Sequence, residues 1–299
     1  MASLNLATCS ETDSDPDSCV WSALRKEAAA YAVKEPAISS LLYAVILDQP
    51  SLGHALVNQL AGKLSTTEFR SLKMAAVLQD ALEADTFIME CAARDLIAVR
   101  ERDPACSSHL HAFLYFKGYM ALQTHRFAHA LHREGRDLLA YHLQNRSSEL
   151  FQVDINPAAR LGCGLMLDHA TGFVVGETAV IGDDCSILQG VTLGGTGKEG
   201  ADRHPKIGRN VLIGAGAKIL GNIKVGDGAK IAAGSVVLKP VPPKCTVAGI
   251  PARPVAGPCC DNPADSMDQT FEATLPNPLN PDHEHPVTQA STKDESHES

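Results

Sequence analysis

The chain has few aromatic residues: they make up 5% of its 299 positions, and Trp21 is the single tryptophan. Any core must therefore be built mainly from aliphatic side chains. No apolar run approaches the ~20 residues that span a bilayer, so we expect no membrane segment. Residues 1–20 contain no Lys or Arg, which argues against a secretory signal and an Arg-rich transit peptide. We therefore expect a cytoplasmic protein.

Cysteine pairs with metal-site spacing and an excess of basic residues are also missing. The nine cysteines are odd in number, scattered, and never spaced Cys-x-x-Cys. We expect free thiols in a reducing cytosol and no metal site. Of the net charge of −9, residues 257–299 contribute −8, from nine acidic residues and Lys293. The remainder is near −1 (−9 minus −8), so no basic field attracts nucleic acid, and we expect none as a partner.

The first half of the chain has the periodicity of helices. Ser65-Thr66-Thr67-Glu68 has the pattern of a capping box, which predicts a helix with Phe69, Leu72 and Ala76 on its packed face. Prolines at 36, 50 and 104 separate neighbouring helical stretches. These patterns predict an all-helical domain over residues 20–150, after a flexible N-terminus at 1–19.

The sequence changes to a period of six from Val175 onward. Aliphatic residues recur every six positions, and a glycine immediately follows many of them. A parallel β-helix produces this repeat, because each coil turns aliphatic side chains inward and the neighbouring coils bury them. An α-helix cannot satisfy a period of six with so many glycines. The aliphatic positions are Val175, Ile181, Ile187, Leu193, Ile207, Ile213, Ile219, Val225, Ile231 and Val237.

Two segments depart from the repeat. Leu193 and Ile207 are 14 residues apart, two more than two repeats, so a loop should leave the β-helix between them. The segment 257–299 contains six prolines and few aliphatic residues. We expect it to form a disordered acidic tail, because it cannot bury enough apolar surface to offset its ordering entropy. The predicted fold is α+β, with the β-helix over residues 151–256.

Polar residues gather at two places in the β-helix, and both suggest chemistry. Asp154 and Asp168-His169 form one group, and Asp202-Arg203-His204 in the predicted loop forms the other. A histidine beside a carboxylate can serve as a general base, because the carboxylate fixes the tautomer and stabilises the imidazolium. The alternative is that His169 is a corner histidine with a purely structural role.

Longer strings in this region resemble serine acetyltransferases of the hexapeptide-repeat acyltransferase superfamily. The similarity runs from about residue 20 to the stretch Met267-Asp268-Gln269-Thr270-Phe271. It is carried by Arg102-Asp103-Pro104, Phe151-Gln152-Val153-Asp154-Ile155, Leu167-Asp168-His169-Ala170-Thr171-Gly172, Val175-Gly176-Glu177-Thr178, the run from Gln189 to Lys198, Asp202-Arg203-His204-Pro205, and the run from Ile213 to Lys218. The resemblance implies a left-handed parallel β-helix and transfer of acetyl from acetyl-CoA to the hydroxyl of L-serine.

The resemblance also implies a role for each matching position. His169 is the expected catalytic base, and Asp154 is the carboxylate paired with it. Asp103 and Asp168 hold the substrate ammonium, while Arg203 and His204 hold its carboxylate. The expected acetyl-CoA groove comprises Gly194, Gly195, Thr196, Gly197, Lys198, Gly214, Ala215 and Ala233.

Further expectations concern partners. We expect a homotrimer or hexamer with active sites between subunits, and feedback inhibition by L-cysteine. Family members often end in an isoleucine that docks into O-acetylserine sulfhydrylase, whereas this chain ends in Glu298-Ser299, which puts that complex in doubt. The alternatives are a hexapeptide acetyltransferase with another small hydroxyl or amino acceptor, a scaffold that has lost catalysis, and a hydratase of the γ-carbonic anhydrase type. The last needs three histidine ligands, and the β-helix half offers His169 and His204 alone.

Overall fold

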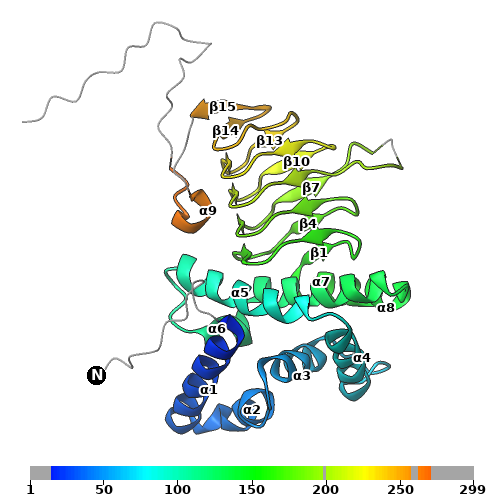
Figure 1. The fold of residues 1–299 in the computed structure, drawn as a ribbon, viewed down its shortest axis with the longest axis vertical. Helices are drawn as coiled ribbons and strands as arrows, with labels where there is room; N and C mark the ends of the chain where they lie inside the picture. The colour runs from blue at the N-terminus through cyan, green and yellow to red at the C-terminus, as the bar shows by residue number, and fades with distance from the viewer. Residues whose placement is uncertain (1–14, 198–199, 257–261, 271–299) are drawn as a thin grey trace, which may run out of the picture.

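A computed structural model describes residues 15–197, 200–256 and 262–270. The first half is helical and lies at one end of a β-helix (Figure 1). Its elements are α1 (Pro16–Lys34), the 3₁₀ turn η1 (Pro36–Ile38), α2 (Ser39–Leu42), the π-helical turn η2 (Tyr43–Leu47), α3 (Leu52–Leu64), α4 (Ser71–Ala84), α5 (Phe87–Arg102), α6 (His109–Tyr115), α7 (Lys117–Arg133) and α8 (Asp137–Phe151). Helix α1 thus begins inside the stretch expected to be flexible, and residues 1–14 of that stretch lie outside the described ranges.

Side-chain caps explain where several of these helices begin. The Asp15 side chain accepts a hydrogen bond from the Ser18 amide and Pro16 occupies the first turn of α1, while Ser51 and Ser108 cap α3 and α6. The predicted capping box at Ser65 is wrong, because α4 begins only at Ser71. Thr66 instead closes a turn: its hydroxyl oxygen accepts from the Phe69 amide at 3.0 Å. Leu72, expected on the packed face, is 84% exposed.

The second half is a parallel β-helix with three faces, as the period of six predicts. Its strands are β1 (Val153–Ile155), β2 (Arg160–Leu161), β3 (Met166–Leu167), β4 (Phe173–Val175), β5 (Val180–Ile181), β6 (Ser186–Ile187), β7 (Thr192–Gly194), β8 (Lys206–Ile207), β9 (Leu212–Ile213), β10 (Lys218–Leu220), β11 (Lys224–Val225), β12 (Lys230–Ile231), β13 (Val236–Val237), β14 (Thr246–Gly249) and β15 (Ala252–Ala256). Successive strands from β1 to β13 take the three sheets in turn, and β14 and β15 both join sheet C. Sheet A contains β1, β4, β7, β10 and β13; sheet B contains β2, β5, β8 and β11; sheet C contains β3, β6, β9, β12, β14 and β15.

The predicted aliphatic positions form the core of the β-helix. On sheet A, Val175 pairs with Leu193, which pairs with Ile219, and Ile219 pairs with Val237. Each of these side chains is at most 2% exposed. Stacking one aliphatic above another removes both from water, at roughly 25 cal/mol for each Å² of apolar surface. The hexapeptide prediction is therefore confirmed, including the loop that leaves the helix between β7 and β8.

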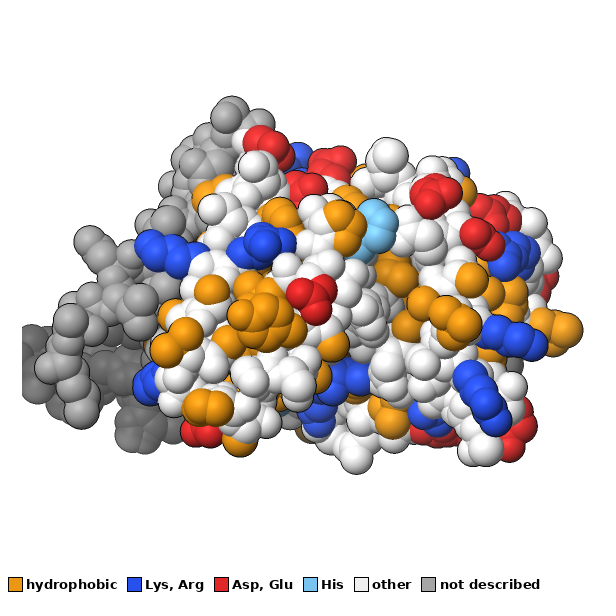
Figure 2. Space-filling view, turned by 90° about the horizontal axis from the view of Figure 1, so that it is seen from below, with side chains coloured by type: hydrophobic (Ala, Val, Ile, Leu, Met, Phe, Trp, Pro, Cys, Tyr) orange, Lys and Arg blue, Asp and Glu red, His pale blue; other side chains and the backbone are white. Residues whose placement is uncertain are grey.

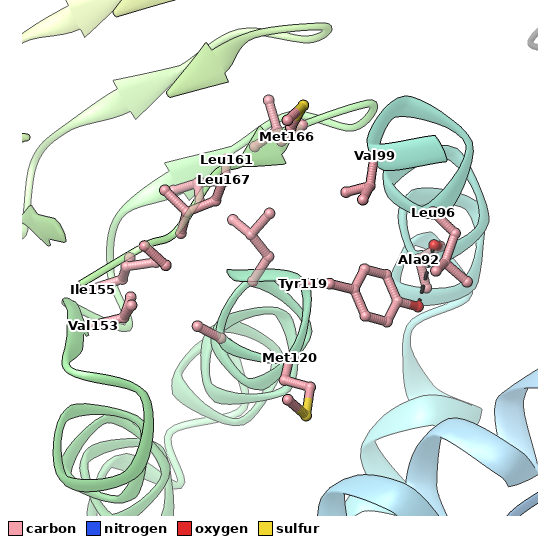
Figure 3. Close-up of a cluster of buried hydrophobic side chains, with 14 of the residues drawn as sticks. Ala92, Leu96, Val99, Tyr119, Met120, Val153, Ile155, Leu161, Met166 and Leu167 are labelled. Atoms are coloured by element: carbon pink, nitrogen blue, oxygen red, sulfur yellow. Dashed lines mark hydrogen bonds between the residues drawn. The ribbon is translucent and has the colours of Figure 1, made fainter. Parts of the chain in front are cut away.

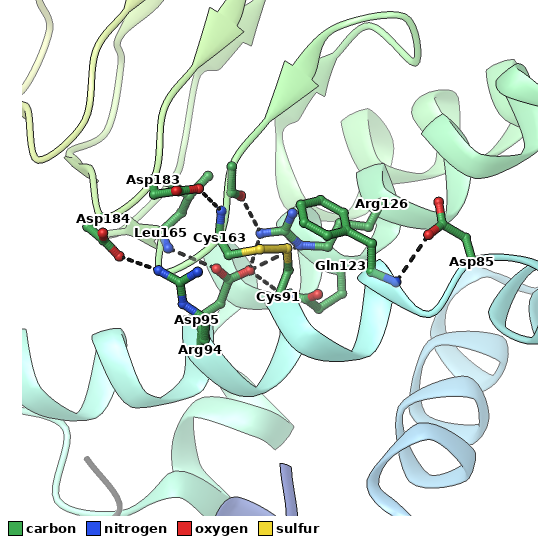
Figure 4. Close-up of a disulfide and its surroundings, with 12 residues drawn as sticks. Asp85, Cys91, Arg94, Asp95, Gln123, Arg126, Cys163, Leu165, Asp183 and Asp184 are labelled. Atoms are coloured by element: carbon green, nitrogen blue, oxygen red, sulfur yellow. Dashed lines mark hydrogen bonds and ion pairs between the residues drawn. A yellow bond between two sulfur atoms is a disulfide. The ribbon is translucent and has the colours of Figure 1, made fainter. Parts of the chain in front are cut away.

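A continuous apolar core joins the two halves. Side chains from α5 and α7 meet those of the first coils, among them Leu96, Tyr119 and Leu167, and the Tyr119 hydroxyl donates to the Ala92 carbonyl at 3.3 Å (Figure 3). A buried ion pair lies beside this core. Asp95 on α5 pairs with Arg126 on α7 at 2.5 Å. The second Asp95 oxygen accepts from the amide of Leu165 in the first coil at 2.8 Å, so both carboxylate oxygens are used (Figure 4).

A disulfide crosses the same junction. It links Cys91 of α5 to Cys163 in the first coil, with a Cα–Cα distance of 4.5 Å (Figure 4). The expectation of free thiols is wrong for this pair, because helix packing brings together two cysteines 72 residues apart. Cys106, Cys185 and Cys245 are free, and Cys185 is buried in the β-helix core.

A short C-terminal segment packs along the outside of the β-helix. Helix α9 (Pro263–Ser266) lies beside α5, and Asp265 pairs with Arg102 at 3.0 Å (Figure 1). The Ser186 hydroxyl donates to the carbonyl of Ala264, which is fully buried. Residues 262–270 of the predicted tail are therefore placed, while 257–261 and 271–299 lie outside the described residues. No helix in the described part of the chain has the length and apolarity needed to cross a membrane.

Candidate active site

Asp168 and His169, from the first group of predicted site residues, lie at the corner between sheets C and A. Residues 168–172 connect β3 to β4, and His169 and Ala170 both have left-handed backbone angles, with φ of 54° and 62°. Such angles are costly outside glycine, and the surrounding hydrogen bonds hold them here. The Thr171 amide donates to the His169 carbonyl at 2.7 Å, and the Gly190 amide of the next coil donates to the Thr171 carbonyl at 2.8 Å. The His169 side chain is 73% exposed.

This corner forms one side of a cavity of about 440 Å³ whose other side is helical. Asp103, just after α5, lines the cavity with Asp168 and His169. Burial and the nearby Asp103 carboxylate raise the pKa of Asp168, while His169 opposes that rise. The Nε2 atom of His169 lies 3.6 Å from Oδ2 of Asp168. A cavity lined by two carboxylates attracts a cation, and the ammonium site stays a prediction.

Asp154, the predicted partner of His169, lies on the outer face of β1. It is half-buried between Val153 and Ile155, which point into the core. Its Oδ1 accepts from Nε2 of Gln144 at 2.6 Å. Among the hydrogen bonds and ion pairs of the described residues, none joins Asp154 to His169; the recorded ion pair of His169 is with Asp168.

The second group of predicted site residues lies at the corner between sheets A and B. Arg203 and His204 are in the loop before β8, packed against Gly176–Thr178 of the preceding coil. The Arg203 guanidinium donates to Glu177 at 2.8 Å. His204 is 6% exposed, and its Nδ1 lies 2.9 Å from the Thr178 hydroxyl. Burial and the adjacent Arg203 cation lower the pKa of His204.

The predicted acetyl-CoA residues divide between the same two corners. Gly194–Gly197 lie at the sheet A/B corner, where Gly195 packs against the Arg203 side chain. Gly214, Ala215 and Ala233 lie at the sheet C/A corner, in coils further along the β-helix than His169. Gly214 is buried against the backbone of Ala233, so these small residues leave no bulky side chain protruding from this edge. Lys198 lies outside the described residues.

The structure therefore brings the predicted residues together in two sets, at opposite edges of sheet A. Asp103, Asp168 and His169 lie at one edge, and Arg203 and His204 lie at the other. Strand β4 runs between the two corners, and its three residues alone span about 10 Å. No group of three or more His, Cys, Asp or Glu side chains in the described ranges could hold a metal ion.

Three further residues support these corners. Nζ of Lys117 donates to the Thr171 hydroxyl across the cavity, and Gly118 packs against the Leu167 carbonyl. Thr178 contacts the Arg203–His204 loop. Thr178 belongs to the Val175–Thr178 string that carries the resemblance, but no periodicity assigns it a partner. Lys117 and Gly118 lie inside a helical run, where no sequence signal shows that they face the β-helix.

Comparisons with known proteins identify relatives of this chain. The chain matches the model of the N-terminal region of serine acetyltransferase over residues 20–124, and that of the bacterial transferase hexapeptide over residues 204–239. It is 55% identical to the serine acetyltransferase of Escherichia coli strain K12, over 84% of this chain and 92% of that protein. The crystal structure of the Vibrio cholerae serine acetyltransferase superposes with a TM-score of 0.84 at 54% identity, covering 85% of this chain and 99% of the other.

Three related structures hold small molecules. A serine acetyltransferase in complex with cysteine has a TM-score of 0.83 at 50% identity, covering 85% of this chain and 98% of that one. The Neisseria gonorrhoeae enzyme in complex with serine has a TM-score of 0.77 at 55% identity, covering 79% of this chain and 97% of that one. The Brucella abortus enzyme in complex with coenzyme A has a TM-score of 0.79 at 53% identity, covering 82% of this chain and 97% of that one.

The β-helix and its period of six place the chain among the hexapeptide-repeat transferases. The identity to curated relatives over most of both sequences is more specific. The chain belongs to the serine acetyltransferase family.

Proposed function

We propose that this chain transfers the acetyl group of acetyl-CoA to the hydroxyl of L-serine, giving O-acetylserine and CoA. The observation that carries the proposal is the cavity at the sheet C/A corner, where a histidine stands beside two carboxylates. Asp103 and Asp168 hold the ammonium of serine, and His169 lies within reach of its hydroxyl. Arg203 and His204 supply donors for the carboxylate, which a guanidinium can bind through two hydrogen bonds.

In the proposed reaction, His169 acts as a general base. It takes the proton of the serine hydroxyl as the oxygen attacks the thioester carbonyl, and a tetrahedral intermediate forms. Collapse of this intermediate breaks the C–S bond, and the CoA sulfur leaves with the proton from His169. We assign Asp154, whose Oδ1 bonds to Gln144 in this structure, to accept the other ring N–H after the exposed His169 side chain turns toward it, and so to stabilise the imidazolium. The thioester is already activated, so no covalent enzyme intermediate is needed.

The small residues at the coil edges suit a long, narrow co-substrate. Gly214, Ala215 and Ala233 leave the backbone at the sheet C/A edge accessible to a pantetheine chain, and Gly194–Gly197 do the same at the sheet A/B edge. We assign these residues to acetyl-CoA binding. Lys198, outside the described residues, is proposed to neutralise a phosphate.

The separation of the two sets supports an oligomer with shared sites. Only two carbon atoms lie between the hydroxyl oxygen of serine and its carboxyl carbon, so one serine cannot reach both edges of sheet A. We therefore place Arg203 and His204 of one subunit against His169 of its neighbour in a homotrimer. Exposed apolar side chains on the helical half, including Val33 and Leu72, suit the pairing of trimers into a hexamer. Figure 2 views the molecule from its helical end and shows apolar groups distributed over that surface.

Mixing two inactive variants tests the reaction and the shared site together. His169→Ala and Arg203→Ala should each be nearly inactive with acetyl-CoA and serine. If both are refolded together, random assembly gives about a quarter of the shared sites an intact His169 from an Arg203→Ala subunit and an intact Arg203 from a His169→Ala subunit. Recovery of about a quarter of wild-type activity supports shared sites. No recovery, with mixed oligomers demonstrated by tagged pull-down, would place each complete site within one subunit.

The remaining proposals concern inhibition, partners and location. L-cysteine has sulfur in place of the serine oxygen, so Asp103, Asp168, Arg203 and His204 should bind it and it should compete with serine. Initial rates that do not change at millimolar cysteine would contradict this. The expectation about the sulfhydrylase complex concerns residues 271–299, which lie outside the described residues. We also propose a cytoplasmic location.

A further inference from the structure

Thr178 makes an unusual number of contacts at the sheet A/B corner. Its hydroxyl oxygen accepts from the backbone amides of Arg203 and His204, each at 3.1 Å. The same oxygen lies 2.9 Å from Nδ1 of His204, and the Thr178 amide donates to that nitrogen at 3.2 Å. One half-buried side chain therefore contacts both residues proposed to bind the substrate carboxylate.

The directions of these hydrogen bonds fix the protonation of His204. A backbone N–H can only donate, so Nδ1 must act as the acceptor of the Thr178 amide. The hydroxyl oxygen already receives two amide protons, and its own proton has Nδ1 of His204 and the Asp202 carboxylate as acceptors. A ring proton on Nδ1 would face the Thr178 N–H. The neutral ring therefore carries its proton on Nε2.

The surroundings hold the ring in this orientation. The imidazole lies over Gly176, in space that a side chain at that position would fill. The Lys206 ammonium donates to the carbonyls of Thr178 and His204, at 2.9 and 2.7 Å, and to Asp202 at 2.6 Å. The remaining charged groups that face the ring are Arg203 and Glu177, which are paired with each other. Nε2 lies against Gly176 and makes no hydrogen bond within the described residues, which leaves its N–H for a ligand.

We propose that Thr178 is a positioning residue for the substrate carboxylate: its hydroxyl holds His204 so that the Nε2–H faces the ligand. This inference rests on the proposed function, because it takes His204 as a carboxylate donor. Thr178 does not touch the reacting atoms. Its loss should therefore weaken serine binding more than it slows the chemical step.

The test compares Thr178→Val with Thr178→Ser in the full-length protein. Valine keeps the shape and removes the hydroxyl, whereas serine keeps the hydroxyl and loses the methyl. We expect Thr178→Val to raise the KM for serine about fivefold, the effect of one lost hydrogen bond, with kcat and the KM for acetyl-CoA changed less than twofold. Thr178→Ser should restore the serine KM to within about twofold of wild type. If serine at 178 impairs binding as much as valine does, the hydroxyl is not the cause and the inference fails.

A double-mutant cycle with His204→Asn separates this inference from the proposed function. Asparagine keeps an acceptor near the place of Nδ1 and lacks Nε2. We expect His204→Asn to raise the serine KM, and adding Thr178→Val to change it no further. Additive effects would overturn the inference.

A raised KM in His204→Asn with a normal KM in Thr178→Val would also overturn it, while the carboxylate assignment would stand. Normal values in both variants would overturn the assignment of His204 and the inference with it. Size-exclusion chromatography and thermal midpoints verify folding, and Thr178→Ala replaces the valine variant if that one fails to assemble.

Discussion

Gly118, in the first turn of α7, lies directly against the backbone carbonyl of Leu167, the last residue before the His169 turn. A Cβ at position 118 would collide with that carbonyl oxygen, and backbone on both sides leaves no flexible group to yield. The contact therefore sets the distance between the helical half and the turn that carries the proposed base.

This contact predicts that Gly118→Ala destabilises the protein by about 2–3 kcal/mol, the usual effect of overpacking a tight core. The matched control is Gly62→Ala on α3, where the added Cβ meets nothing within 4 Å. There the better helix propensity of alanine should stabilise by about 0.5–1 kcal/mol. Chemical denaturation of both variants measures the difference. Equal stabilities would show that α7 can shift away from the turn.

The proposed base predicts different losses for two variants. His169→Ala should lower kcat about 10²–10⁴-fold, because a positioned general base contributes that much. Asp154→Asn keeps the hydrogen bond with Gln144 available and leaves the base in place, so we expect a smaller loss of about 10–100-fold. Circular dichroism should be unchanged in both, since His169 is exposed and Asp154 points outward. Near-normal turnover in His169→Ala would show that another group removes the proton.

The fold could be predicted from the sequence further than the site could. The period of six requires stacked coils, and it placed Val175, Leu193 and Ile219 in one buried column. Local propensity was a weaker guide: the capping pattern at Ser65 forms a turn instead of a helix start. Contacts between distant segments have no periodicity to reveal them. The pairing of Thr178 with His204 and of Cys91 with Cys163 depends on how the coil and helices pack, and neither is visible in spacing.

The junction disulfide predicts a redox-dependent stability. Alkylation of the denatured, unreduced protein should leave Cys91 and Cys163 unmodified and label Cys106, which is free and buried in the native state. A covalent link across 72 residues restricts the unfolded chain, so reduction should lower the free energy of unfolding by about 2–4 kcal/mol. The response to reductant should be smaller in Cys91→Ala than in the wild type, because Cys19 is also disulfide-bonded, and Cys106→Ala should retain the full response. Labelling of all three cysteines before reduction would show that the pair is reduced in the purified protein.

The two carboxylates of the cavity predict the pH dependence of serine binding. Burial and the Asp103 charge raise the pKa of Asp168, so Asp168 takes up its proton at a higher pH than an exposed aspartate does. Only the ionised carboxylate attracts the serine ammonium, so affinity is present above this pKa and declines as the pH falls through it. Asp103→Asn removes the charge that, together with burial, raises the pKa of Asp168. The variant should bind serine more weakly at neutral pH, and its acid decline should move to lower pH. Calorimetric titration with serine, without acetyl-CoA, measures binding separately from the chemical step. An acid midpoint that is unchanged or higher in Asp103→Asn would show that the two carboxylates do not share the ammonium.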